Sequence, residues 1–75
     1  GSRIGLAQVS LEQARNNLRR SEELATQGYV SATKLETDRL ALRAAQREYE
    51  AAEEDRHVAK HDLTQARAAL TAIRE

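Results

Sequence analysis

Two stripes of residues, each repeating every seven positions, constrain this chain more than any other feature of its sequence. The first stripe combines Ile4, Leu11, Leu18 and Ala25 with Ala7, Ala14 and Ser21. The second stripe combines Leu35, Leu42, Tyr49, Arg56, Leu63 and Leu70 with Asp38, Ala45, Ala52, Ala59, Ala66 and Ile73. A seven-residue repeat of mainly apolar residues is typical of helices that pack side by side in a coiled coil.

A single break separates the two stripes. Gly28 can adopt the left-handed conformation that commonly ends a helix. Ser31 is a residue type that caps helix N-termini well, and Val30 and Leu35 have the spacing of a hydrophobic staple. We therefore predict that one helix ends near Gly28 and a second begins just after Ser31.

The predicted fold is all-α, an antiparallel two-helix coiled-coil hairpin with a longer second helix. The sequence predicts a first helix over residues 3–27, a tip turn over 28–31 and a second helix over 32–75. A connection this short favours antiparallel neighbours. Folding the chain there places Leu11 opposite Tyr49, so that large side chains meet large ones, and small side chains meet along the same register.

The second helix is expected to extend beyond the first, because residues 57–75 have no counterpart in the shorter arm. The stripe nevertheless continues there through Leu63, Leu70 and Ile73. We expect this segment to pair with a second copy in the isolated chain, and with an upstream part of the first helix in a longer protein. Residues 1–2 are interpreted as a cloning remnant, and the chain as an excised piece of a larger protein.

The composition argues against several classes of function. The chain has 12 basic and 12 acidic residues, and this zero net charge argues against a nucleic-acid-binding surface. It has no Cys, so it can form no disulfide and holds no thiolate metal site. No arrangement of nucleophile, base and orienting group is recognisable, so we expect neither an enzyme nor a cofactor.

The residues around the break form a distinct motif. Arg20 and Leu24 are four positions apart and share a helix face, and Ser31 follows seven positions later across the turn. Leu24 lies outside the heptad stripe, where a structural hairpin would favour a polar residue. We expect these three residues to gather at the tip as a partner-binding surface, with Tyr29 and Val30 as further candidates.

The spacing Arg-x3-Leu-x6-Ser ahead of a long helix resembles the hairpin tip of periplasmic adaptor proteins, also called membrane fusion proteins, of the AcrA, MacA and HlyD type. The resemblance covers nearly the whole chain, but only the hairpin of such adaptors. It implies that Arg20, Leu24 and Ser31 contact a TolC-type outer-membrane channel. It also implies a link to an inner-membrane transporter, assembly with other adaptor copies into a hexamer, and a periplasmic location.

Other interpretations of the same residues stay open. The chain can be a structural or oligomerisation hairpin unrelated to transport. Ser31 caps a helix whether or not it contacts a partner, and Leu24 can belong to the hairpin core. His57 and His61 have a spacing that can hold zinc on a helix, but with no further convergent ligand we expect no metal site.

Overall fold

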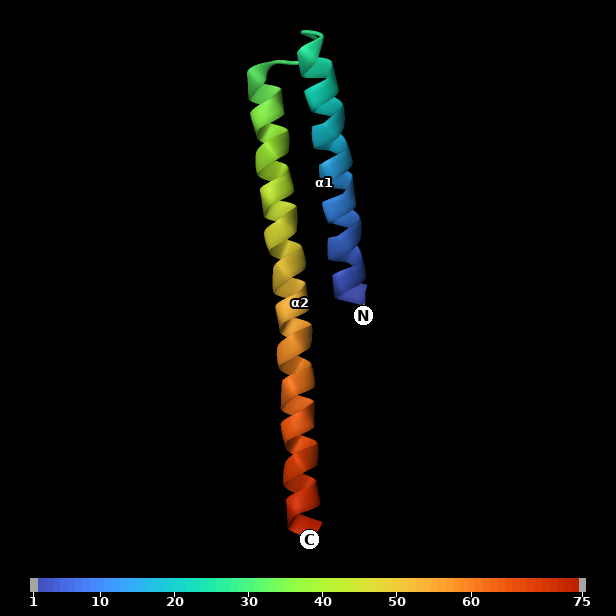
Figure 1. Ribbon diagram of the computed structural model, residues 1–75, viewed down its shortest axis with the longest axis vertical. Coiled ribbons are helices and arrows are strands. Elements are labelled where there is room, and N and C mark those ends of the chain that lie inside the picture. Colours follow the sequence, from blue (N-terminus) through green and yellow to red (C-terminus); the bar gives the residue numbers. More distant parts are fainter. Residues whose placement is uncertain (1, 75) are drawn as a thin grey trace.

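The computed structural model describes residues 2–74, which form two antiparallel helices joined by a short turn (Figure 1). Helix α1 spans Ser2–Thr26 and helix α2 spans Ala32–Arg74. The molecule is a rod with extents of 71 × 16 × 13 Å, and α1 lies beside only the tip-proximal part of α2. This confirms the predicted all-α hairpin with a longer second helix. Gly1, half of the interpreted cloning remnant, lies outside the described residues, as does Glu75.

Burial follows the two heptad stripes. Most of the buried residues are small residues of the two stripes. Leu11 is the one large apolar side chain that is also buried. The buried residues are Ala7, Leu11, Ala14, Ser21, Asp38, Ala45 and Ala52. The large residues on either side are half-buried, and they are Ile4, Leu18, Leu35, Leu42 and Tyr49. Because Ala occupies most of the central positions, the two backbones can approach closely, as the alternation of large and small residues predicts.

The turn is closed by hydrogen bonds that end α1 at a left-handed glycine. Gly28 has a φ of 77°, as its place in the sequence predicts. The Gly28 amide donates to the carbonyl of Ala25 at 3.0 Å, and the Tyr29 amide donates to the carbonyl of Leu24 at 2.9 Å. This pair of bonds is the Schellman motif, which satisfies the last carbonyl groups of a helix.

Helix α2 begins at a serine cap. The Ser31 hydroxyl accepts a hydrogen bond from the Lys34 amide at 3.0 Å, which confirms the predicted N-cap. The Ser31 carbonyl accepts the first bond within the helix, from the Leu35 amide at 3.1 Å. Val30 and Leu35, the predicted staple pair, are both half-buried. The turn between the two helices therefore has a fixed backbone.

Replacing the turn glycine tests this geometry. Gly28→Ala is expected to lower the free energy of unfolding by about 1–2 kcal/mol, because an L-residue is strained in the left-handed conformation. A Cβ at Gly28 would meet nothing within 4 Å, so the effect comes from the backbone alone. Urea unfolding followed by circular dichroism measures the change.

Gly5 provides a control of opposite sign for that substitution. It lies within α1, and a Cβ there would also meet nothing within 4 Å. Gly5→Ala should raise the free energy of unfolding by roughly 0.5–1 kcal/mol, because alanine is the better helix former. Equal effects of the two substitutions would show that the left-handed turn does not hold in solution.

Beyond the point where α1 begins, α2 continues as a single helix (Figure 1). Arg3 forms an ion pair with Asp55, which marks the point on α2 where α1 begins. From Glu53 to Arg74 every side chain of α2 is exposed, including the stripe residues Leu63, Leu70 and Ile73. Beyond Asp55, α2 therefore carries a heptad stripe against which no other part of residues 2–74 is packed.

Candidate functional site

The predicted tip residues occupy different environments. Arg20 is exposed on α1, Val30 is half-buried in the turn, and Ser31 is exposed at the start of α2. Leu24 is 38% exposed to solvent and Tyr29 is 73% exposed, so neither is a core residue of the hairpin. For Leu24, this exposure argues against the interpretation that it belongs to the core.

A shallow groove of about 200 Å³ lies between the two helices near the tip. Its lining residues are Asn17, Arg20, Ser21, Leu24, Val30, Lys34 and Asp38. The structure thus brings together Arg20, Leu24 and Val30 from the predicted set. Ser31 and Tyr29 do not line the groove: the Ser31 hydroxyl faces the backbone that it caps, and Tyr29 lies exposed in the turn.

The floor of this groove holds a polar cluster that sequence reasoning did not identify. The Ser21 hydroxyl donates a hydrogen bond to the Asp38 carboxylate across the two helices. The Lys34 ammonium pairs with the same carboxylate at 3.0 Å, one turn earlier on α2. Ser21 and Asp38 are both buried, although the stripe around them is mostly apolar. Their polar character at opposed positions of the two stripes was the one signal in the sequence, although it does not by itself predict a hydrogen bond.

Both contacts stabilise the charged form of the aspartate. The hydrogen bond from Ser21, followed by that from Lys34, lowers the pKa of Asp38 below its ordinary value of 3.8. A carboxyl group whose pKa is lower in the folded state stabilises the fold above its unfolded pKa. That stability is lost as the pH falls through the folded pKa. The hairpin should therefore become less stable as the pH falls below about 4.

Asp38→Asn tests this linkage. The asparagine variant should lose less stability than the native chain between about pH 6 and about pH 2.5, because it has no carboxylate to protonate at this position. Thermal unfolding followed by circular dichroism at both pH values gives the comparison. Asp62→Asn, in the unpaired part of α2, should retain the native pH dependence. An identical pH dependence for Asp38→Asn and the native chain would contradict the proposed role of the cluster.

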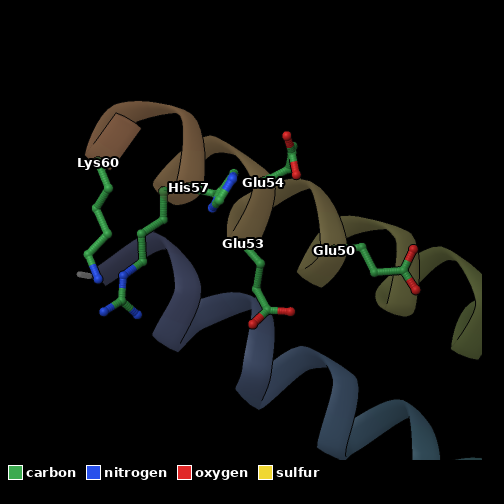
Figure 2. Close-up of a pocket in the computed structure, with 6 residues that line it drawn as sticks. Glu50, Glu53, Glu54, His57 and Lys60 are labelled. Carbon is green, nitrogen blue, oxygen red and sulfur yellow. The ribbon is translucent and has the colours of Figure 1, made fainter. Parts of the chain in front are cut away.

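A second hollow, of about 450 Å³, lies where α2 passes the beginning of α1. It is lined by Glu50, Glu53, Glu54, Arg56, His57 and Lys60, all from α2. Figure 2 shows that these side chains do not converge on one point, since Glu53 extends toward α1 and Glu54 extends away from it. The hollow is an open notch of mixed charge, and its residues form no recognisable catalytic arrangement.

The interpretation of His57 and His61 as a metal site gains no support. Within residues 2–74, no group of three or more His, Asp or Glu side chains is placed to share a metal ion. Both histidines are exposed on the unpaired part of α2.

Neither helix between residues 2 and 74 has the length and apolar character needed to cross a bilayer.

Comparison with known proteins does not assign this chain to a family. A scan against protein-family models, a search of curated proteins and a search of solved structures each found no match. The geometry of the hairpin and the motif at its tip are therefore the features that bear on its function.

Proposed function

We propose that this chain is the α-helical hairpin of a periplasmic adaptor protein, and that its tip docks onto the periplasmic end of a TolC-type outer-membrane channel. In this proposal the adaptor belongs to a tripartite efflux pump or a type I secretion system, and it connects the channel to an inner-membrane transporter. Six adaptor copies would surround the channel axis. The proposal rests on the resemblance of the tip motif and on the groove beside it.

The observation that carries the proposal is that Arg20 and Leu24 open onto one groove at the tip. Leu24 supplies an apolar contact, and the Arg20 guanidinium can donate paired hydrogen bonds to carboxylates or carbonyl groups of a partner. Lys34 adds a second positive charge to the lining of the groove, partly neutralised by Asp38. A surface of this kind suits the end of a partner helix, where free carbonyl groups carry partial negative charge.

The remaining predicted contacts have more limited roles in this proposal. Ser31 fixes the start of α2, so its contribution is chiefly to hold the turn in shape. Tyr29 lies in the turn with 73% of its surface exposed, so in this proposal it is available for contact with a partner although it does not line the groove. Exposed tyrosines of this kind are common at protein interfaces.

Binding to the isolated periplasmic tip of a TolC-type channel tests the proposal. A single hairpin should bind weakly, and six copies on a ring-shaped scaffold should bind at least about 100-fold more tightly through multivalency. Surface plasmon resonance with both forms measures the difference. Absence of binding by the six-copy form would favour the alternative, a structural hairpin without this partner.

A further inference from the structure

We propose that the unpaired part of α2 is covered by the same segment of a second copy, running antiparallel to it. The face in question, here called the free seam, consists of Ala59, Leu63, Ala66, Leu70 and Ile73. All five residues are exposed, and Ile73 retains 81% of its exposure. They continue the stripe that α1 covers nearer the tip, so the free seam has the spacing of a coiled-coil surface that lacks its second helix. The inference concerns the 75-residue chain itself, and its test does not require the proposed function to hold.

The free seam is self-complementary when two copies are antiparallel. With a two-fold axis beside Ala66, Leu63 of each copy faces Leu70 of the other. In the same register Ala59 faces Ile73, and the two Ala66 residues face each other. Leucine therefore meets leucine, and Ile73, which is the most exposed residue of the free seam at 81%, meets a small one. A symmetric interface of this kind uses the same surface on both copies and closes as a dimer.

The point on α2 beside which α1 begins is compatible with this antiparallel dimer. Because Arg3 contacts Asp55, α1 begins beside that part of α2. In the antiparallel dimer, Ile73 of the second copy lies opposite Ala59, so its α2, which spans Ala32–Arg74, ends close to the point where α1 begins. The negative end of one helix dipole then adjoins the positive end of another, which is favourable. The hairpin of the second copy lies beyond Arg74, clear of the first.

Helix α1 blocks a parallel dimer. If the two free seams met in parallel, the two α2 helices would face each other along the stripe that α1 occupies nearer the tip (Figure 1). Each α1 would then have to lie between the two α2 helices near the tip. The same two helices would be in direct contact a few residues further from the tip, which leaves no room for α1. The antiparallel arrangement has no such conflict, and so the structure favours it.

Charges beside the free seam give the dimer a distinctive response to salt. In the α1–α2 pair, Arg3 and Asp55 show that residues on the same flank of two antiparallel stripes face each other. By this rule Arg67 of one copy faces Arg67 of the other, and Lys60 faces Arg74. These like charges repel, and added salt screens them. We therefore expect the dimer to become tighter as the salt concentration rises.

The contact strip is small. Residues 57–74 span roughly 27 Å at ~1.5 Å per residue, and a helix is about 10 Å wide. Such a strip belongs with small interfaces that bury less than about 1,200 Å². We expect a weak dimer, with a dissociation constant on the order of 10–100 µM.

Sedimentation equilibrium of the full 75-residue chain tests association, at concentrations up to about 1 mM. The dissociation constant should fall about threefold or more between about 50 and about 500 mM NaCl. Leu70→Asp should weaken the dimer at least about 100-fold. Leu40→Asp is the matched control, because Leu40 is 54% exposed and Leu70 is 55% exposed, but Leu40 lies outside the stripe. A strictly monomeric native chain, or a dimer that weakens in salt, would overturn the proposal.

Engineered cysteines test the orientation, since the chain has no cysteine of its own. Ala59→Cys and Ile73→Cys variants are mixed and oxidised, with circular dichroism confirming that each stays helical. In the antiparallel dimer position 59 faces position 73, whereas the two copies of position 59 lie roughly 20 Å apart. Disulfide-linked mixed dimers should therefore exceed either like pair about tenfold. A predominance of Ala59→Cys like pairs would show that the copies run parallel.

Discussion

Leu24→Asp is expected to weaken binding to the periplasmic tip of a TolC-type channel by about 30-fold or more, with helix content unchanged. The expected loss corresponds to about 2 kcal/mol, the size of effect found at central interface residues. Leu24 lines the tip groove beside Arg20, so an aspartate there would place an unpaired carboxylate in the proposed contact. Because the side chain is 38% exposed, the hairpin itself should tolerate the change.

Arg20→Glu should produce a loss of similar size, because it reverses the charge on the same groove. Surface plasmon resonance gives the binding constants, and circular dichroism with thermal unfolding gives the stability. Leu40→Asp serves as the control, since Leu40 is an exposed leucine that does not line the groove. If Leu24→Asp or Arg20→Glu also unfolds the hairpin, then that residue belongs to the core and its assignment to docking is wrong.

Leu11→Ala is expected to cause the largest loss of stability of any large-to-small substitution in the hairpin, about 2–3 kcal/mol. Leu11 retains only 6% of its exposure, and it is the one large side chain among the buried residues named above. It forms a cluster with Ala14 and Ala45, against which Leu42 and Tyr49 pack. The two alanines of this cluster are too short to fill the space that the leucine would leave. In a domain this short, such a loss removes much of the total stability.

Leu6→Ala is the control for that substitution. Leu6 is on the same helix and has the same side chain, but it is 70% exposed. Its replacement should change the free energy of unfolding by less than about 0.5 kcal/mol. Urea unfolding of both variants, followed by circular dichroism, measures the difference. Equal losses would mean that the two arms do not pack in solution along the stripe that contains Leu11.

The heptad stripes made most of this fold predictable. A repeat of seven sets which face of each helix is buried, and Gly28 and Ser31 set where the chain turns, because few residues suit those two backbone positions. Leu11 and Tyr49 pack in one cluster, as the register predicts. These features depend on local backbone preference and on periodicity, and both can be deduced from one sequence.

The polar part of the tip was less predictable. Ser21 and Asp38 were assigned to the stripes, but periodicity does not say that two polar members will bond to each other. That contact depends on the axial offset between the helices, which periodicity alone does not determine. The role of Ser31 was ambiguous for a related reason, since one hydroxyl can cap a helix or face a partner. Its bond to the Lys34 amide shows that it caps α2.

The unequal lengths of the two helices also determine how the rod deforms. Two helices joined along a packed seam resist bending far more than one, because bending must stretch one helix and compress the other. Nearer the tip, α1 and α2 resist bending together, whereas beyond Asp55 only α2 resists it (Figure 1). A sideways force on the tip therefore leaves the two-helix part straight and bends the single-helix part of α2, so the tip moves as a rigid unit.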